Sequence, residues 1–531
     1  MKKRIPIILM MILIVCMIAA CSSGNTTTNS NANANKGTEP AAQTENTTEP
    51  EAQTEDTTEP EPAAPAANLS IMVQNHPAWP LKEDWLVWKV MGDLGHVNLK
   101  PLPIQGNWWE TIPLIVASGD LPDILWTAGD LFQKYGQEGA FVNYLEHLDK
   151  MPNLANFMKQ YPEEVKPLLS ADGKLYVTPS HDAFDKLQSL FMYREDIFKK
   201  NNLQQPTNYD EFYALLKKLK ELYPDSTPWV FFNQLSITTI LGLNFDTDFG
   251  FYFNQSTNSY AYGPSEDNYK AMVEFLNKLY KEKLISTEFL TMDLKQRSDL
   301  ISNDKAFIIN GYINELDSFN QEIRKTNPDF KLAQFTPPVS PMGKQFHSRD
   351  LSFLGEGLSV SSKTKELDAA LGLIDAMYSE QAKEALSWGV EGQTFTKADG
   401  KDQFDGAVAN ANDRRIKFGL QTPGTSFWVD NDSNLALMSP ESKQAAEEGS
   451  KFVAPKSFTP AFTKEEQDVL SLNGQAIGKY AEENISKFII GNRSLSEWND
   501  YVEGYKKLGL DDVLKVYNEA KQRADSTQLG N

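Results

Sequence analysis

Cysteine is almost absent from this chain of 531 residues: Cys16 and Cys21 are its only two, and both lie near the N-terminus. Cys16 belongs to an apolar run that ends at Ala20. If the chain is cut after Ala20, one cysteine is left, so no disulfide can form within the chain. Without further cysteines, the rest of the protein can hold neither a metal site built on thiolates nor a cysteine nucleophile.

The first twenty residues have the pattern of a secretory signal. Residues 1–4 are basic, an uninterrupted apolar run follows, and small residues close it. The run is shorter than the roughly 20 residues that a membrane-spanning helix needs. Residues 18–21, Ile-Ala-Ala-Cys, resemble a bacterial lipobox. We therefore predict that residues 1–20 are a lipoprotein signal peptide and that Cys21 is acylated; an ordinary signal with an incidental cysteine is the alternative.

The next segment lacks apolar side chains. Residues 22–67 contain no aromatic residue and no Ile, Leu, Val or Met, and they repeat TEPAAQTENT as TEPEAQTEDT. These units have nothing to stack, which excludes a solenoid, and they cannot bury enough apolar surface to offset the entropy lost on folding. We predict that residues 21–67 are a lipid-anchored, disordered Thr/Glu/Pro-rich tether, which spans on the order of 40 Å.

Positive charge is also scarce. The chain carries a net charge of −21; residues 1–20 contribute +3 and residues 22–67 contribute −7, so residues 68–531 carry −17. Binding to a phosphate backbone depends on Lys and Arg that neutralise its charge. The charge balance therefore argues against nucleic acid as a partner.

From residue 68 onward, short apolar runs alternate with longer amphipathic stretches. This alternation implies an α/β fold with a mostly parallel sheet and flanking helices. The last third of the chain is predicted to be mainly helical. The periodicity predicts strands over 68–74, 97–104 and 122–126, helices over 81–95 and 109–120, a helix capped by Thr207, and a hairpin over 249–263.

Several motifs, in their order along the chain, carry a family resemblance. They are ASGDLPDILWTAGD (117–130), DGKLYVTPS (172–180), DKAFIING (304–311), LSWGVEGQTF (386–395) and the C-terminal stretch from Phe488. Together they make residues 68–531 resemble an extracellular solute-binding protein of family 1, the carbohydrate ABC-importer type that includes maltose-binding protein. The last two motifs resemble its large, lipid-anchored Gram-positive subgroup.

The resemblance implies a two-lobed periplasmic-binding-protein-like fold. Each lobe would be a mostly parallel sheet flanked by helices, and a hinge would join the lobes. The implied limits are approximately 68–182 and 318–378 for the first lobe, and 183–317 and 379–531 for the second. Small-molecule sites favour clefts between lobes, and closure around a hinge is a known switching mode.

The resemblance also implies a receptor without catalytic activity or a cofactor. It would be a monomer held at the extracellular face of the cell membrane by lipid on Cys21. It would capture a carbohydrate, an oligosaccharide by the size of the chain, and deliver it to ABC permease subunits driven by a cytoplasmic ATPase. Two alternatives remain: the same fold binding an oligopeptide or another solute, and a lipid-anchored glycoside hydrolase, which would need two carboxylates. The chain has no G-x-S-x-G elbow, P-loop or dinucleotide fingerprint.

Sugar sites combine aromatic platforms with carboxylates or amides that bind hydroxyl groups. Trp85, Trp88 and Trp498 fall on helical faces and are predicted to be core. The resemblance places a stacking Trp and a hydroxyl-binding Asp at the end of the third strand, where Trp126 and Asp130 stand; aligning Asp130 puts Thr127, not Trp126, at the stacking position. The predicted ligand-binding residues are Trp79, Trp108, Trp109, Trp126, Asp130, His181, Tyr312, Trp388, Glu391, Phe427 and Trp428.

Each of these residues also has a purely structural interpretation. Trp79, Trp108 and Trp109 follow predicted strands, and the adjacent pair cannot both face the core. His181 follows Pro179 at the predicted crossing between lobes. Tyr312 lies next to Ile313, which takes the place of the family's second-lobe tryptophan. Trp388 and Glu391 lie between glycines, and Phe427 and Trp428 lie in a polar loop; in all these cases packing between the lobes is the alternative.

The sequence predicts no metal site. Its five histidines are scattered, without the H-x-x-H or H-E-x-x-H spacing of zinc sites. Residues 244–250, NFDTDFG, alternate amide or acidic side chains as a calcium loop does. They lack the glycine at the sixth position and a distal Glu, so they match such a loop poorly.

Overall fold

The computed structural model describes residues 66–182, 189–231, 235–350, 355–457 and 459–526. The chain divides into two units, Met1–Ala63 and Ala64–Asn531, and the described residues belong to the second. The predicted signal, Cys21 and the tether up to residue 65 lie outside the described residues; the predicted limit of the tether at residue 67 is wrong by one residue, because Ala67 begins a strand. Among the helices that are described, none is long and apolar enough to cross a membrane.

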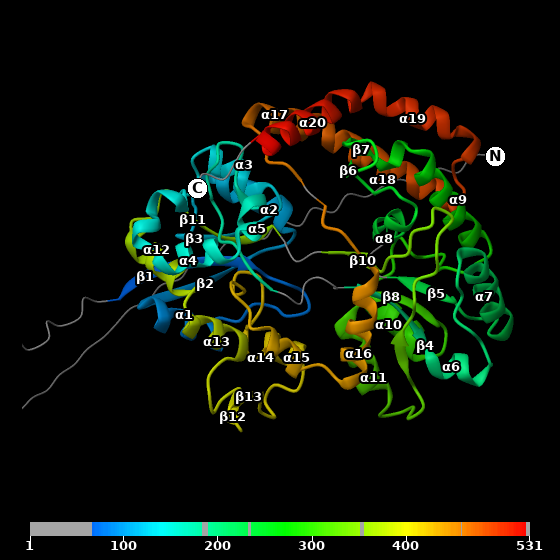
Figure 1. Ribbon diagram of the computed structural model, residues 1–531, viewed down its shortest axis with the longest axis horizontal. Coiled ribbons are helices and arrows are strands. Elements are labelled where there is room, and N and C mark those ends of the chain that lie inside the picture. The colour runs from blue at the N-terminus through cyan, green and yellow to red at the C-terminus, as the bar shows by residue number, and fades with distance from the viewer. Residues whose placement is uncertain (1–65, 183–188, 232–234, 351–354, 458, 527–531) are drawn as a thin grey trace, which may run out of the picture. The chain divides into compact units, whose positions relative to one another are not determined.

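The first sheet has the strand order β11-β3-β1-β2 (Figure 1). β1 (Ala67–Gln74) pairs in parallel with β2 (Val97–Ile104) and β3 (Ile124–Ala128), and β11 (Glu356–Val360) pairs antiparallel with β3. In β1 every second side chain is buried, whereas β3 is buried along its whole length. This pattern makes β3 a central strand. The strands predicted over 68–74, 97–104 and 122–126 are confirmed, the last shifted by two residues.

Helices pack on the first sheet and complete its core. Trp85 and Trp88 are each 4% exposed and belong to this core, as predicted. Leu420, Phe427 and Trp428 join the same core from far along the chain. The elements are α1 (Leu86–Gly95), α2 (Trp108–Ser118), α3 (Leu131–Gln137), α4 (Pro152–Gln160), α5 (Pro162–Val165), α12 (Leu367–Ala376), α13 (Glu380–Trp388), β12 (Phe395–Ala398), β13 (Lys401–Phe404) and α14 (Ala411–Phe418).

The second sheet has the strand order β5-β8-β4-β9. β5 (Trp229–Phe231) and β8 (Ile308–Tyr312) are parallel, whereas β4 (Ser189–Arg194) runs antiparallel to β8 and to β9 (Leu332–Gln334). The α/β fold is therefore confirmed, but the prediction of a mostly parallel sheet is wrong for this lobe. β4 lies between β8 and β9 and runs opposite to both, so the pairing of β5 with β8 is the parallel one in this sheet.

Helices and a hairpin surround the second sheet. The hairpin predicted over 249–263 is confirmed as β6 (Phe251–Asn254) and β7 (Ser259–Tyr262). The predicted cap Thr207 is wrong: Asn208 caps α7, because its Oδ1 accepts from the N–H of Glu211 at 2.9 Å. The helices are α6 (Glu195–Lys200), α7 (Tyr209–Leu222), α8 (Ser236–Asn244), α9 (Asp267–Lys281), α10 (Leu294–Ser302) and α11 (Ile313–Ile323).

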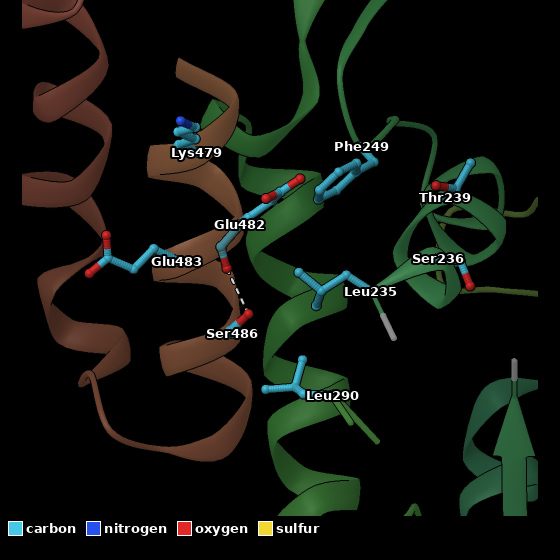
Figure 2. A pocket seen from close by; sticks show the side chains of 9 residues that line it. All are labelled: Leu235, Ser236, Thr239, Phe249, Leu290, Lys479, Glu482, Glu483 and Ser486. Atoms are coloured by element: carbon cyan, nitrogen blue, oxygen red, sulfur yellow. Dashed lines mark hydrogen bonds between the residues drawn. The ribbon is translucent and has the colours of Figure 1, made fainter. Parts of the chain in front are cut away.

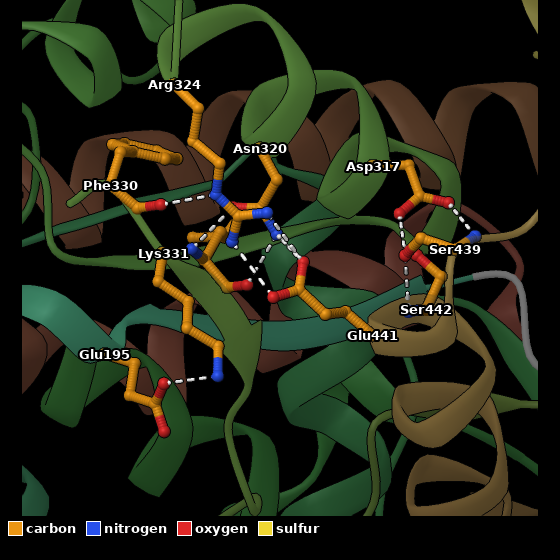
Figure 3. A network of polar contacts seen from close by, with 10 residues as sticks. Glu195, Asp317, Asn320, Arg324, Phe330, Lys331, Ser439, Glu441 and Ser442 are labelled. Atoms are coloured by element: carbon orange, nitrogen blue, oxygen red, sulfur yellow. Dashed lines mark hydrogen bonds and ion pairs between the residues drawn. The ribbon is translucent and has the colours of Figure 1, made fainter. Parts of the chain in front are cut away.

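The C-terminal part of the chain returns to the second sheet. Figure 3 shows the polar contacts between α16 (Pro440–Gly449) and α11. The guanidinium of Arg324, which follows α11, donates two hydrogen bonds, each 3.0 Å long, to the carboxylate of Glu441 in α16. Asp317 of α11 accepts from the N–H of Ser439 at 3.0 Å. The remaining elements are α15 (Asn431–Ala436), β10 (Ser348–Arg349), β14 (Val453–Ala454), α17 (Lys464–Val469), α18 (Gln475–Ile490), α19 (Trp498–Lys507) and α20 (Leu510–Ser526).

The two cores group the chain differently from the predicted lobe limits. The predicted range 318–378 would place β9 in the first lobe, yet β9 pairs with β4 in the second sheet. The predicted range 379–531 would place Phe427 in the second lobe, yet Phe427 lies in the first core. We propose a first lobe of 66–182 and 355–429, and a second lobe of 189–350 and 438–526.

Candidate functional site

The carboxyl ends of β1, β2 and β3 lie at one edge of the first sheet, because these strands are parallel. Ligands of open α/β sheets bind at this edge. The residues that follow the three strands therefore define the candidate site. Trp79 follows β1, Trp108 and Trp109 follow β2, and Asp130 follows β3.

Three tryptophans pack against one another at this edge. Trp108 meets the ring of Trp126 edge to face at 5.3 Å between centroids, and meets Trp109 at 5.1 Å. Trp126 is 1% exposed, so it supports the ring of Trp108 and presents no face to a ligand, whereas Trp109 is 46% exposed. Thus Trp109, not Trp126, supplies an open aromatic surface.

Gly129 brings this surface next to Asp130. The backbone at Gly129 is left-handed, with φ +68°, and a Cβ there would lie 2.6 Å from Cζ3 of Trp109. A larger residue would push the ring away. Asp130 precedes α3, but its side chain does not cap that helix. Asp130 thus directly follows the glycine that touches the ring, and its carboxylate does not serve the helix.

A second carboxylate lies on the neighbouring strand. Glu356 of β11 pairs with Ala128 of β3, and the N–H of Gly129 donates to the carbonyl of Gly355 at 2.9 Å. Burial raises the pKa of Glu356 to about 7 and also raises the pKa of Asp130. Neither carboxylate has an ion-pair partner in the described part of the chain. Two desolvated carboxyl groups of this kind suit hydroxyl groups, which can donate to them.

Sequence reasoning missed Glu356. It stands in FLGEGLSV, which has no feature that separates it from other strand-edge glutamates. The informative signal is its register opposite Ala128, and that pairing joins segments far apart in the chain.

We expect the variant Glu356→Gln to gain stability over the unmodified protein as the pH rises. An unfolded Glu titrates near about 4.3, and the folded pKa is about 7. The folded state therefore holds this proton more tightly, and its contribution to stability, complete below about pH 4.3, is lost as the pH rises through 7. Urea unfolding should show no difference at pH 4 and a gain on the order of 2 kcal/mol at pH 8.

The exposed Glu391, replaced by Gln in the same way, serves as the control for the substitution itself and should change the free energy of unfolding by less than about 0.5 kcal/mol. Equal curves for Glu356→Gln and the unmodified protein at both pH values would contradict the buried placement of Glu356.

His181, Phe427 and Trp428 meet at the crossing between the lobes. The N–H of His181 donates to the carbonyl of Phe427 at 2.8 Å, and its Nδ1 lies 3.0 Å from Oε1 of Glu164. Phe427 is 2% and Trp428 7% exposed, and both belong to the first core. The structure therefore gives these two rings a packing role, because neither offers a free face; a ligand contact by His181 stays a prediction.

Trp388 is also a packing residue in this structure. It is 2% exposed, and its Nε1–H donates to Oδ2 of Asp430 at 2.8 Å. Glu391 is exposed in the turn before β12. Tyr312 ends β8 in the second sheet and is 46% exposed. Unlike Trp388, it therefore offers an open aromatic surface.

Trp79 lies over two charged or titratable side chains. Its ring stacks on His76 at 3.8 Å, and the guanidinium of Arg415 lies 5.0 Å from the ring centroid. Burial, then the charge of Arg415, lowers the pKa of His76. Trp79 is thus held in place by its own loop and by α14, and a direct contact with a ligand stays a prediction.

A hollow of about 600 Å³ lies elsewhere, in the second lobe (Figure 2). None of the eleven predicted residues lines it. Its walls come from α8, α18 and the loops at 249 and 290, and it is lined by Leu235, Ser236, Thr239, Phe249, Leu290, Lys479, Glu482, Glu483 and Ser486.

The acidic side chains of residues 244–250 pair with basic neighbours. Asp248 pairs with Nη2 of Arg349 at 2.6 Å, and Asp246 with Nζ of Lys344 at 3.4 Å. Among the described residues, no group of three or more His, Cys, Asp or Glu is placed to hold a metal ion.

Comparisons with known proteins agree with this architecture. Residues 96–384 match the family described as bacterial extracellular solute-binding protein. The chain is 23% identical to the lipoprotein LipO of Bacillus subtilis over 442 residues, which cover 79% of this chain and 85% of LipO. The alginate-binding protein AlgQ2, solved without calcium ion, is 26% identical with a TM-score of 0.76 over 87% of this chain and 98% of AlgQ2. The substrate-binding protein FusA of Streptococcus pneumoniae, solved with kestose, is 18% identical with a TM-score of 0.70. The match covers 87% of this chain and 100% of the FusA chain.

Proposed function

We propose that this chain, which belongs to the bacterial extracellular solute-binding proteins, captures an oligosaccharide and delivers it to the permease of an ABC importer. The observation that carries the proposal is the exposed Trp109 ring against Gly129, at the edge of the first sheet where β3 and β11 bring Asp130 and Glu356. Sugar rings have an apolar face that stacks on an aromatic ring and a rim of hydroxyl groups that donate to carboxylates.

The relatives support a saccharide as the ligand. AlgQ2 is named for alginate binding, and FusA was solved with kestose. An oligopeptide would find few backbone partners at a site made of one indole and two carboxylates, so we place it second. A glycoside hydrolase is third, because the family is one of binding proteins.

The mechanism follows from two lobes that share one ligand. The first lobe presents Trp109 and Asp130, and the second presents the exposed Tyr312 at the end of β8. A ligand that contacts both lobes binds the closed state more tightly and shifts the population toward it. Docking of that closed state on the permease would then start transport, with energy from the partner ATPase.

The lipobox supports anchoring through Cys21, and the relative LipO is itself named a lipoprotein. The anchor and tether would keep the receptor at the outer face of the membrane as a monomer. Replacing Cys21 by Ser should move the protein from the membrane fraction to the medium; a variant that stays with the membrane would contradict the anchor.

A thermal-shift screen tests the proposed ligand class. A ligand that binds only the folded state raises the free energy of unfolding by about 2.7 kcal/mol at a hundredfold excess over its dissociation constant. We expect a concentration-dependent rise in melting temperature with oligosaccharides of one class and none with oligopeptides. A rise with peptides alone would contradict the proposal.

A further inference from the structure

The hollow in the second lobe has the size of a small-molecule site. Its volume of about 600 Å³ lies within the range of about 300–1,000 Å³ that ligand pockets occupy. α8 and α18 both pack into the second core, through residues such as Ile237 and Ile477. The hollow therefore belongs to one lobe and does not depend on how the two lobes close.

Phe249 supplies an aromatic surface in this hollow. It is half-buried and packs against the second core, but it makes no contact with another aromatic ring among the described residues. Its N–H donates to Oδ1 of Asp248 at 2.7 Å, and Arg349 holds Oδ2 of the same carboxylate at 2.6 Å. The backbone here is tightly packed, since a Cβ on Gly263 would lie 1.7 Å from the carbonyl oxygen of Asp248. The backbone that carries the ring is thus held in place before any ligand arrives.

Hydrogen-bond donors and acceptors line the hollow together with the Phe249 ring. Figure 2 shows the Glu482 carboxylate directed toward Phe249, whereas Glu483 points away. Glu483 pairs with Lys487 at 2.6 Å, but Glu482 and Lys479 have no ion pair in the described part of the chain. Thr239 adds an exposed hydroxyl from α8. The hollow therefore offers a carboxylate acceptor, an ammonium donor and a hydroxyl beside an aromatic face.

We propose that this hollow is a second saccharide subsite, which stacks one neutral sugar unit on Phe249 and holds its hydroxyl groups with Glu482 and Lys479. The inference rests on the proposed function and extends it: the ligand is long enough to reach beyond the site at Trp109. The Glu482 carboxylate, which is directed toward Phe249, disfavours a uronate stacked on that ring, because the two carboxylates would repel each other.

The test measures how affinity depends on chain length. The purified protein is titrated calorimetrically with fructo-, malto- and manno-oligosaccharides, from disaccharides to hexasaccharides. For the class that binds, Phe249→Ala should weaken the hexasaccharide about tenfold and leave the disaccharide unchanged. Glu482→Gln should weaken the hexasaccharide about fivefold, while its neighbour Glu483→Gln, the matched control, should change nothing.

The outcomes separate this inference from the proposed function. If the unmodified protein binds no oligosaccharide, the proposed function is wrong and the subsite with it. If it binds, but Phe249→Ala and Glu482→Gln leave the hexasaccharide affinity unchanged or weaken every length equally, only the subsite is wrong. Oligogalacturonate binding that depends on Phe249 would overturn the neutral class. Glu482→Gln changes one exposed side chain, so it decides the matter even if Phe249→Ala unfolds.

Discussion

Replacing Asp130 by alanine should lower the affinity for the proposed oligosaccharide by about a hundredfold, because the carboxylate that we propose to accept from two hydroxyl groups would be lost. The melting temperature of the unliganded protein stays the same or rises. Burial raises the pKa of Asp130, so its charge costs folding free energy, and its side chain caps no helix. Calorimetric titration and a melting curve measure the two effects separately.

Asp120 provides the matched control for this substitution. It lies in the exposed loop between α2 and β3, and its side chain belongs to no ion pair among the described residues. Asp120→Ala should bind as the unmodified protein does. If Asp130→Ala binds with unchanged affinity, the site at the end of β3 is not where the ligand lies.

Replacing Arg194 by methionine should lower the free energy of unfolding by about 3 kcal/mol, the largest stability effect that we expect. Arg194 ends β4, is 0% exposed, and lies 4.2 Å from the ring of Phe330. Its guanidinium donates to both carboxylate oxygens of Asp196, at 2.8 and 2.6 Å, and pairs with Asp304 at 2.6 Å. Methionine keeps most of the volume but leaves Asp196 without its partner in a largely buried place.

The control for Arg194 is Arg324, which makes a similar two-pronged pair with Glu441 (Figure 3). The Arg324 side chain is 34% exposed, so solvent screens the pair. Arg324→Met should cost less than about 1 kcal/mol. Urea unfolding at pH 7 measures both variants; equal losses would show that burial does not set the difference.

Local periodicity predicted much of the fold. Buried side chains alternate along β1 and β7, and β1, β2 and the hairpin of β6 and β7 each follow from a short stretch of sequence. Trp85 and Trp88 lie on one helical face and are buried as predicted. In these elements the spacing of residues along the chain decides which side chains face inward.

Long-range packing decided what the sequence did not reveal. Phe427 and Trp428 stand in a polar, glycine-containing stretch that is typical of an exposed loop, yet both pack into the first core. Trp388 ends α13 and packs against the rings of Phe395 and Phe404. The lobe limits depend on the pairing of β9 with β4, and no pattern within a short stretch of sequence predicts that pairing. Glu356 gains its desolvated position only through pairing with β3. The open aromatic residue of the first lobe is Trp109 because Gly129 leaves it room, a contact between separate elements.

Equilibrium dialysis of the purified protein against the oligosaccharide that raises its melting temperature tests the central claim most directly. We predict saturable binding of one oligosaccharide per chain, loss of that binding in Asp130→Ala, and recovery of the ligand with its chain length unchanged. Shortened ligand would show a hydrolase, and binding of peptides in place of saccharides would show a receptor of another class; either result would contradict the account.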